Sequence, residues 1–235
     1  MQQPRIETPD ISEKGAQDQR SDTRLFFQLM CFGGCRDTAL AVDAVKASNL
    51  QAVLYEDLHN PFGIGVLTIS QDPGDFLGPV RKLFQQRPFA GLHPRHDLTM
   101  FGRTYSIGYE HDLPETLLHR PRRTALTPDW PWAIWYPLRR SGAFNQLSKD
   151  EQNDIVKEHG TLGMAFGKAD YAHDIRLACH GLDRNDNDFV IGLTGKDLHP
   201  LSAIVQAMRR TKQTSQYLQN LGPFFVGKAV YQAGL

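Results

Sequence analysis

Strand-like and helix-like segments follow one another along this chain in an order that occurs twice. In each half, apolar or aromatic runs typical of buried strands come before, between and after two amphipathic segments with helical spacing. Each half therefore has the order βαββαβ. The first half has expected strands at 24–33, 51–58, 63–70 and 98–109 and expected helices at 36–48 and 75–87. The second half has expected strands at 131–140, 174–180, 188–194 and 224–232 and expected helices at 148–166 and 198–211.

The repeated order predicts an α+β protein in which two tandem ferredoxin-like βαββαβ modules face their sheets together and form an α/β barrel. The expected units are a disordered tail (1–23), an N-terminal module (24–118), a linker rich in Pro and Arg (119–130) and a C-terminal module (131–235). No G-x-G-x-x-G or G-x-x-x-x-G-K-[ST] motif follows a strand, which argues against a nucleotide cofactor bound by either loop.

Charge and hydropathy exclude some partners. Lys and Arg together number 26, as do Asp and Glu, so no overall field attracts nucleic acid or anionic lipid. The first 22 residues are polar, and no apolar run approaches the roughly 20 residues of a membrane-spanning helix. We therefore expect a cytoplasmic protein with neither a nucleic-acid nor a membrane partner.

The three cysteines are too few to form a secreted disulfide framework, which favours a reducing compartment. Cys31 ends an apolar run and Cys35 begins a helix, while Cys179 stands alone. A metal or redox role for Cys31 and Cys35 is the alternative, but no second cysteine pair completes a zinc site. We interpret all three as structural thiols.

His159 differs from the other eight histidines in its surroundings. It lies one turn after Ile155 in the expected helix 148–166, on or beside the apolar face, and Gly160 and Gly163 follow it. An inward-facing imidazole next to residues without bulk suits a flat cofactor such as haem, whose iron binds a neutral ring nitrogen. A hydrogen-bonded core histidine is the alternative interpretation.

Several short motifs in the second half resemble, in the same order, those of the chlorite dismutase-like family. That family has a YP strand, an acidic helix ending in H-G, a GLDD-DF hairpin, an LR-x-TE-x-S helix and a P-F-x-G strand. The corresponding segments here are Tyr136-Pro137, Ser148–Glu151, Glu158-His159-Gly160, Gly181-Leu182-Asp183, Asp188-Phe189-Val190, MRRTKQTSQY at 208–217 and Gly222–Gly227. The resemblance spans residues 128–231, whereas the N-terminal half matches only in its inferred architecture.

The resemblance implies two ferredoxin-like modules per subunit, a haem in the C-terminal module and a homo-oligomer, commonly a pentamer. It places His159 on the proximal ligand of the haem iron. It also places Tyr136 on the tyrosine that serves as radical site in the coproheme decarboxylases of the family. For Tyr136 the alternative is a strand residue with its hydroxyl at the rim. The implied cofactor is haem b or coproheme.

Arg176 resembles the distal arginine of true chlorite dismutases, because it precedes His180 in an R-x-x-x-H context. A guanidinium over the open iron face would stabilise an anionic oxidant. A different gap placement brings Asp174 or His173 to that position instead. An ion pair of Arg176 with Asp174 or Asp183 at a strand edge is the alternative to a distal role.

Further side chains resemble groups at the porphyrin edge. Arg209 matches an arginine that contacts a propionate in the decarboxylases, and Arg139 or Arg140 could act similarly through charge-assisted hydrogen bonds. A solvated basic face is the alternative for all three. Phe144 occupies the place of an aromatic residue near the haem edge. His119 could act as a distal proton shuttle if its loop folds over the iron.

The chain departs from the family at one position beside the iron. The family usually has a glutamate on the LR-x-TE helix that accepts a hydrogen bond from the proximal imidazole, whereas Lys212 or Gln213 stands there in this chain. A second-shell carboxylate makes the ligand more basic, so its loss predicts a higher iron potential and weaker peroxidase-type activation.

The resulting hypothesis is a haem-dependent oxidoreductase that activates peroxide or a related small oxidant at a His-ligated iron, with coproheme decarboxylation as one form. A non-enzymatic haem carrier is the second hypothesis, favoured by the missing glutamate. A haem-free barrel that serves as a binding module is the third, since such folds have many functions.

Overall fold

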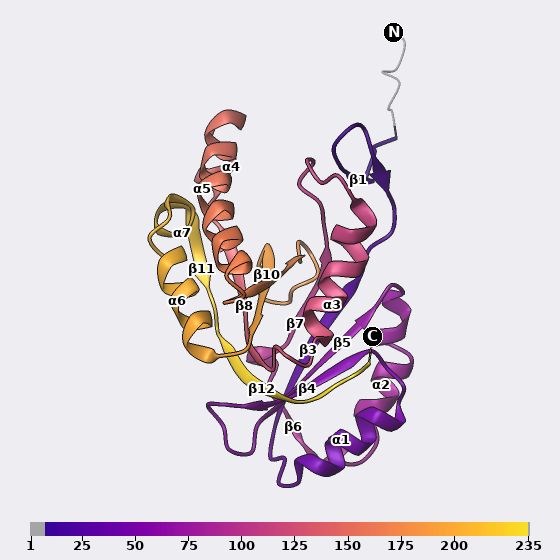
Figure 1. Ribbon diagram of the computed structural model, residues 1–235. Coiled ribbons are helices and arrows are strands. Elements are labelled where there is room, and N and C mark those ends of the chain that lie inside the picture. Colours follow the sequence, from indigo (N-terminus) through magenta and orange to yellow (C-terminus); the bar gives the residue numbers. More distant parts are fainter. Residues whose placement is uncertain (1–7, 235) are drawn as a thin grey trace.

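The computed structural model describes residues 8–234, and its strands and helices are arranged in two neighbouring lobes (Figure 1). In the N-terminal half, strand β3 (Phe26–Gly33) is followed by helix α1 (Thr38–Ala47) and by strands β4 (Ala52–Asp57) and β5 (Ile64–Ser70). Helix α2 (Pro79–Phe84), the short strand β6 (His93–Pro94) and strand β7 (Met100–Thr104) complete it.

The C-terminal half has the same sequence of elements with additions. Strand β8 (Trp132–Arg140) leads through the short helix α4 (Gly142–Asn145) into the long helix α5 (Lys149–Lys168). Strands β9 (His173–Ala178) and β10 (Phe189–Gly195) follow, then helices α6 (Leu198–Met208) and α7 (Lys212–Tyr217). Strands β11 (Leu218–Leu221) and β12 (Phe225–Gln232) end the half.

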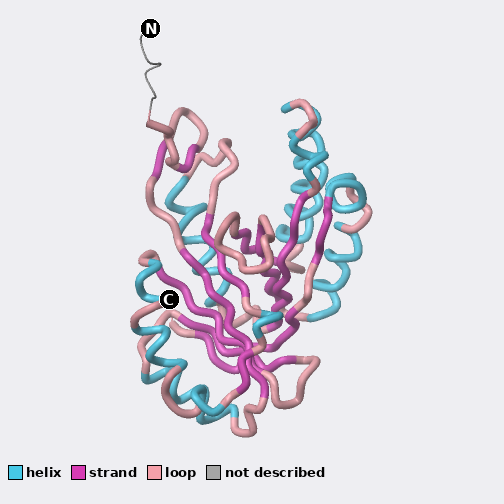
Figure 2. Tube along the Cα trace, turned by 180° about the vertical axis from the view of Figure 1, so that it is seen from behind, coloured by secondary structure: helices cyan, strands magenta, loops and turns pink. Residues whose placement is uncertain are grey.

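One large antiparallel sheet contains strands from both halves in the order β10-β9-β7-β3-β5-β4-β12-β8-β11. Strand β8 also pairs with β10, so the chain of pairings returns to its start. Within each half the fourth strand lies beside the first and the second beside the third. The halves meet where β7 pairs with β9 and where β12 pairs with β4. The strands lie at the centre and the helices at the periphery (Figure 2).

Three hydrophobic clusters hold this arrangement together. One joins strands of both halves and includes Phe27, Trp135 and Phe225. A second packs α1 and its neighbours on the N-terminal half of the sheet. The third packs α6 and the end of α5 on β8 and β10, through residues such as Leu193 and Leu201. Burying these side chains supplies most of the driving force for folding.

The capping box that the sequence predicts at the start of α5 is confirmed. Ser148 accepts a hydrogen bond from the backbone N–H of Glu151, and the Glu151 carboxylate accepts one from the N–H of Ser148. This capping box fixes the start of the helix and so the positions of all later side chains on it. The helix extends to Lys168, two residues beyond the expected end.

Two expectations differ from the structure. Part of the expected disordered tail folds as a hairpin of β1 (Glu13–Lys14) and β2 (Arg20–Ser21), because Glu13 is buried and accepts hydrogen bonds from Arg103 and the N–H of Ser106. Residues 1–7 of that tail lie outside the described residues. The expected linker 119–130 contains helix α3 (Arg120–Leu126), which follows a π-helical turn (Glu115–His119). Within residues 8–234, no helix has both the length and the apolarity needed to cross a membrane.

Candidate functional site

One face of the sheet, below helix α5, carries two of the predicted site residues in a single row. Ile191 of β10 pairs with Tyr136 of β8 on one side and with Arg176 of β9 on the other. Directly paired residues project from the same face of a sheet, so these three side chains share a face. Their strand neighbours Trp135 and Leu177 project to the other face, into the cluster that joins the two halves.

His159 lies on α5, above this face, and is half-buried. Its Nδ1 is 3.1 Å from Oγ1 of Thr211, a buried residue that precedes α7. Within the described residues, Nε2 makes no hydrogen bond. The imidazole is therefore held through Nδ1 alone among the described residues.

Burial lowers the pKa of His159, and the positive charges of Arg140 and Arg176 lower it further. All three effects favour the neutral ring, which is the form that binds a metal. The charge of the predicted residue Arg176, on a strand, thus acts on the predicted ligand His159, on a helix.

Arg140 reaches the same space from the end of β8. Its guanidinium lies over the ring of Phe144 at 4.5 Å and over the ring of Phe189 at 4.8 Å. Nη2 donates to Oε1 of Gln213 at 3.3 Å, whereas Nε is buried without a partner in residues 8–234. A buried donor without an acceptor is costly, which suggests that an anionic or polar ligand completes it.

The other predicted arginines lie farther out. Arg139, the neighbour of Arg140, pairs with Asp186 at 2.7 Å on the exposed side of β8. Arg209, at the end of α6, is exposed, and its charge acts on the pKa of Tyr136. Arg176 pairs with Asp174 at 3.0 Å and keeps 37% of its side chain exposed. The alternative ion pair of Arg176 with Asp174 is therefore present, and the charge of Arg176 acts on the pKa of His159 as well.

Tyr136 is buried rather than placed at a rim. Its ring stacks on that of Phe224, with centroids 4.7 Å apart, and burial raises the pKa of its hydroxyl. It belongs to the same hydrophobic cluster as Leu201 and Ile204 of helix α6. The tyrosine is therefore protected from water in this structure.

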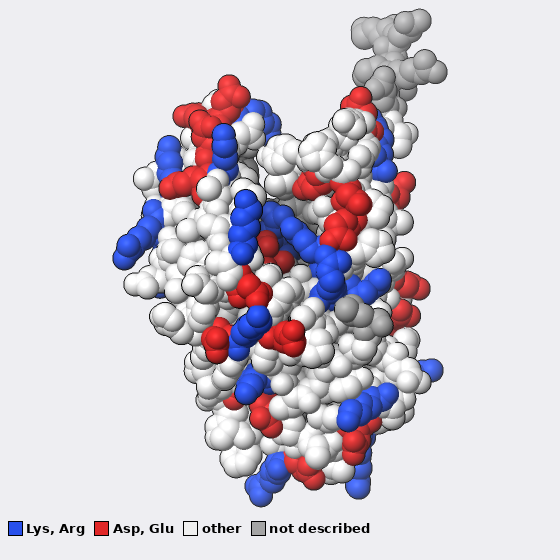
Figure 3. Space-filling view, viewed as in Figure 1, with Lys and Arg blue, Asp and Glu red and all other residues white. Residues whose placement is uncertain are grey.

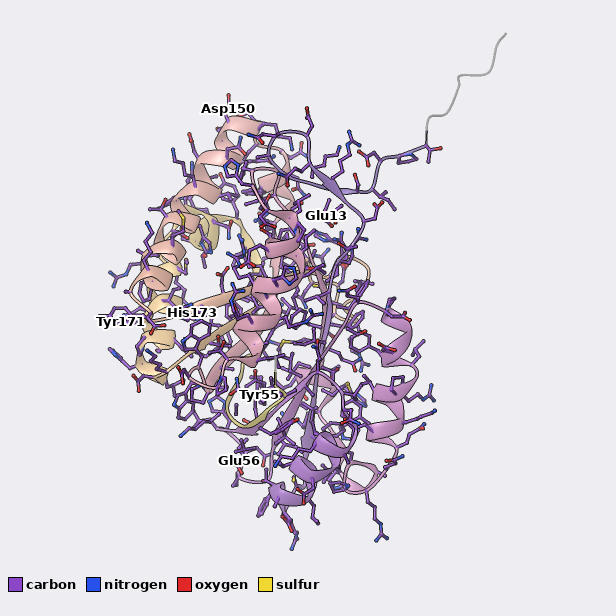
Figure 4. The ribbon with its side chains drawn as sticks, turned by 45° about the vertical axis from the view of Figure 1, so that its right-hand side comes forward. Glu13, Tyr55, Glu56, Asp150, Tyr171 and His173 are labelled. Atoms are coloured by element: carbon purple, nitrogen blue, oxygen red, sulfur yellow. The ribbon has the colours of Figure 1, made fainter. Side chains whose placement is uncertain are left out.

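The remaining histidines named from the sequence lie elsewhere. His173 stacks on Trp130 at 3.5 Å and hydrogen-bonds Asp170, near the end of α5 that is distant from Asp150 (Figure 4). This packing removes His173 from the distal candidates, whereas Asp174 remains near His159, whose pKa its charge raises. His180 is mostly exposed, 3.7 Å from Asp188. His119 lies exposed in the π-helical turn before α3, and the loop expected there is helical.

The cysteines are free and buried, as expected for structural thiols. Burial raises the pKa of the Cys179 thiol to about 12, and its Sγ contacts the carbonyl oxygen of Asn187. Residues 8–234 contain no group of three or more His, Cys, Asp or Glu side chains that could hold a metal ion.

Sequence reasoning missed two residues. Tyr105 follows β7 in the N-terminal half, its ring is 5.5 Å from that of Phe189, and the charges of Arg176 and Arg140 act on its pKa, which burial raises. Thr211 is the second, because the contact with His159 joins positions 52 residues apart. No local pattern in the sequence marks either residue.

The surface is hollowed between the lobe that carries α4 and α5 and the lobe that carries α3 and β1, and basic side chains line the hollow (Figure 3). Acidic side chains lie around its edge. A concave surface of this kind, with inward-facing cations, is suited to a ligand that carries carboxylates.

Comparison with known families identifies the family of this chain. A family model described as chlorite dismutase matches residues 96–230, more than half of the chain. The chain belongs to the chlorite dismutase family. The matched region begins before β7 and includes Tyr105, the whole row on the sheet, α5 and Thr211. No curated protein sequence matches this family member.

Solved structures share the fold of this chlorite dismutase family member at low sequence identity. A haem-binding protein from Thermus thermophilus is 20% identical, with a TM-score of 0.68 over 89% of this chain and 94% of that one. A mutant chlorite dismutase from Candidatus Nitrospira defluvii is 15% identical, with a TM-score of 0.66 over 90% of this chain and 93% of that one. The similarity extends over both halves, including the N-terminal half, whose motifs show no resemblance.

Proposed function

We propose that this protein binds haem b or coproheme between α5 and the sheet, with Nε2 of His159 as the iron ligand. The observation that carries the proposal is the half-buried His159 imidazole, which contacts Thr211 through Nδ1 and whose pKa is lowered by burial and by the charges of Arg140 and Arg176. The structurally similar protein from Thermus thermophilus is described as haem-binding, which agrees with this proposal. We further propose that the two halves are ferredoxin-like modules (24–118 and 131–235) that close as an α/β barrel.

The residues at the site fit a porphyrin in three respects. Nε2 of His159 is available, the buried Nε of Arg140 lacks an acceptor within the described part of the chain, and a Cβ added at Gly160 would meet nothing within 4 Å. Arg140 would bind a propionate, Arg209 would supply a second cation at the outer edge, and Phe144 would pack beside the ring. Within the site, Arg140 is better placed than Arg139, which pairs with Asp186 on the exposed side.

Bound haem would supply an open iron coordination position for peroxide or a related small oxidant. Arg176 would hold an anionic oxidant and stabilise charge that develops on its leaving group. Tyr136, buried against Phe224, would supply an electron and a proton from its hydroxyl if the reaction is coproheme decarboxylation. We propose an oxidoreductase on this basis. A haem carrier is the second candidate, because the hydrogen-bond acceptor at Nδ1 is a hydroxyl and not a carboxylate.

The first experiment is a titration of the purified protein with haem and with coproheme. A Soret band that is lost in His159→Ala and kept in His180→Ala is expected, since His180 is mostly exposed. If the unaltered protein shows no spectral shift, haem binding is contradicted and the hypothesis of a haem-free binding module remains. A band kept in His159→Ala would mean that another residue binds the iron.

The second experiment separates an enzyme from a carrier. Peroxide added to the coproheme complex should give two successive mass losses from decarboxylation, and Tyr136→Phe should abolish them. Without such losses, turnover of peroxide or chlorite would indicate another oxidoreductase, and no turnover would indicate a carrier. Native mass spectrometry would test the homo-oligomer, with a pentamer expected.

A further inference from the structure

The Thr211 hydroxyl occupies a position that determines which nitrogen of His159 carries a proton. Thr211 is buried between α6 and α7 and forms the N-cap of α7. Its Oγ1 lies 2.8 Å from the carbonyl oxygen of Met208 and 3.1 Å from Nδ1 of His159. Both contacts are within hydrogen-bond distance.

The hydroxyl has one proton, and the carbonyl oxygen of Met208 can only accept. The carbonyl oxygen of Met208 also accepts from the backbone N–H of Thr211 at 3.1 Å, but the side-chain contact at 2.8 Å is the shorter of the two that the hydroxyl makes here. We therefore assign the hydroxyl proton to Met208, so Thr211 accepts from His159 and Nδ1 carries the imidazole proton. The Oγ1 atoms of Thr211 and Thr214 are 3.4 Å apart, and since either hydroxyl can donate or accept, this longer contact leaves the assignment unchanged. The lone pair of Nε2 is then free for iron, which is the tautomer that a haem ligand requires.

No carboxylate competes for Nδ1 in the described residues. The nearest acidic neighbour in sequence, Glu158, accepts a hydrogen bond at 3.0 Å from the backbone N–H of Lys212. Asp174 is paired with Arg176. Of the two residues expected at the family's glutamate position, Lys212 is exposed, and Gln213 directs its carbonyl oxygen to Arg140. The acceptor at the imidazole is therefore Thr211, one position before Lys212 and two before Gln213.

We propose that Thr211 is a positioning residue that fixes the Nδ1–H tautomer of His159 and, as a neutral acceptor, keeps the bound iron at a higher reduction potential than a carboxylate would. Only the statement about the reduction potential rests on the proposed haem binding. An acceptor without charge draws the Nδ1 proton less strongly, so the imidazole donates less electron density to the iron. The tautomer is a property of the haem-free chain.

Three variants test the proposal. Thr211→Val removes the hydroxyl at nearly constant volume, Thr211→Ser keeps it, and Thr211→Glu supplies the carboxylate. In the haem-free protein at pH 8, ¹⁵N chemical shifts of the His159 ring should show Nδ1–H in the unaltered protein and in Thr211→Ser. In Thr211→Val they should move toward the Nε2–H tautomer. An unaltered protein with Nε2–H, or a Val variant without change, overturns the tautomer assignment.

With haem bound, the Fe–His stretching frequency and the reduction potential test the second part. Thr211→Val should lower the stretching frequency and weaken haem binding roughly 10- to 100-fold, as second-shell changes do. Thr211→Ser should restore both. Thr211→Glu should raise the frequency and lower the potential, and if it fails to fold, the Val and Ser pair still decides. Equal values in the unaltered and Val proteins overturn this part, whereas a Soret band that survives His159→Ala overturns the proposed function instead.

Discussion

Tyr136 on β8 and Arg176 on β9 lie on the two strands that flank β10, and both are paired with Ile191 of β10. Their side chains project from the same face of the sheet, on the side of α5. A buried phenol and a cation therefore flank one aliphatic side chain in the proposed haem site. Because strand register fixes this relation, the arginine is held at its place by backbone pairing and by its ion pair with Asp174.

Arg176→Gln should weaken binding of fluoride or azide to the ferric haem complex roughly 10- to 100-fold. The reason is that one hydrogen bond to a charged group contributes about 1.5–3 kcal/mol. Absorption titrations would measure the dissociation constants. Arg139→Gln is the matched control, because Arg139 pairs with Asp186 on the exposed side and should leave anion binding unchanged. Equal loss in both variants would contradict a distal role for Arg176.

Arg140→Met should reduce affinity for haem roughly tenfold but leave affinity for haem dimethyl ester nearly unchanged. The methionine keeps contact with Phe144 and Phe189, and only the charge-assisted hydrogen bond to a carboxylate is lost. Fluorescence quenching titrations with both porphyrins would measure this difference. A similar loss for both porphyrins would indicate that Arg140 shapes the site through packing alone.

The sequence was sufficient to predict those features that depend on neighbouring positions. The order of strands and helices followed from hydrophobic spacing, and the start of α5 followed from Ser148 and Glu151. His159 was placed on the inner side of that helix by its spacing from Ile155. The resemblance in short motifs added the family, which the family model confirms.

Features that depend on distant contacts could not be predicted. The hairpin of β1 and β2 is held by Glu13 through Arg103, a contact across 90 positions. Helix α3 has Pro121 in its first turn, where proline is tolerated, so the Pro-rich sequence that suggested a linker is compatible with a helix. Thr211 contacts His159 only because α6 and α7 return the chain to α5.

Two glycines should respond in opposite ways to alanine. Gly160→Ala should raise the free energy of unfolding of the haem-free protein by about 0.5–1 kcal/mol, because the residue is helical and its Cβ would meet nothing within 4 Å. Gly192→Ala should lower it by about 1–3 kcal/mol or more, because the Cβ would lie 2.5 Å from the Trp135 ring. Urea denaturation followed by circular dichroism would measure both. A destabilised Gly160→Ala would place another group against that position.

Removing a buried hydroxyl from Tyr55 should not destabilise the protein. Burial raises the pKa of Tyr55, and the nearby Trp135 indole has a smaller, opposite effect. Neither Oη of Tyr55 nor Nε1 of Trp135 has a hydrogen-bond partner within residues 8–234. Tyr55→Phe therefore relieves an unpaired polar group, and the free energy of unfolding should rise by about 1 kcal/mol. Phe225→Leu is a contrasting variant, since it loses the edge contact with Tyr55 and should be destabilised. A clear loss of stability in Tyr55→Phe would show that the hydroxyl has a partner in solution.

Asp170 should make the stability of the protein depend on pH in the acid range. Hydrogen bonds from Lys196 and His173 lower the pKa of Asp170 from its ordinary value of 3.8 to about 2. The unfolded chain therefore binds this proton at higher pH than the folded chain does. The stabilising contribution is complete above pH 3.8 and is lost as the pH falls toward 2.

Asp170→Asn should flatten the fall in the free energy of unfolding over this window, as measured by urea denaturation at successive pH values. Asparagine tolerates the positive φ of 56° at this position, so the backbone should not change. Asp186→Asn, also at positive φ, controls for the loss of one charge, and an equal slope in Asp170→Asn and the unaltered protein would contradict the prediction.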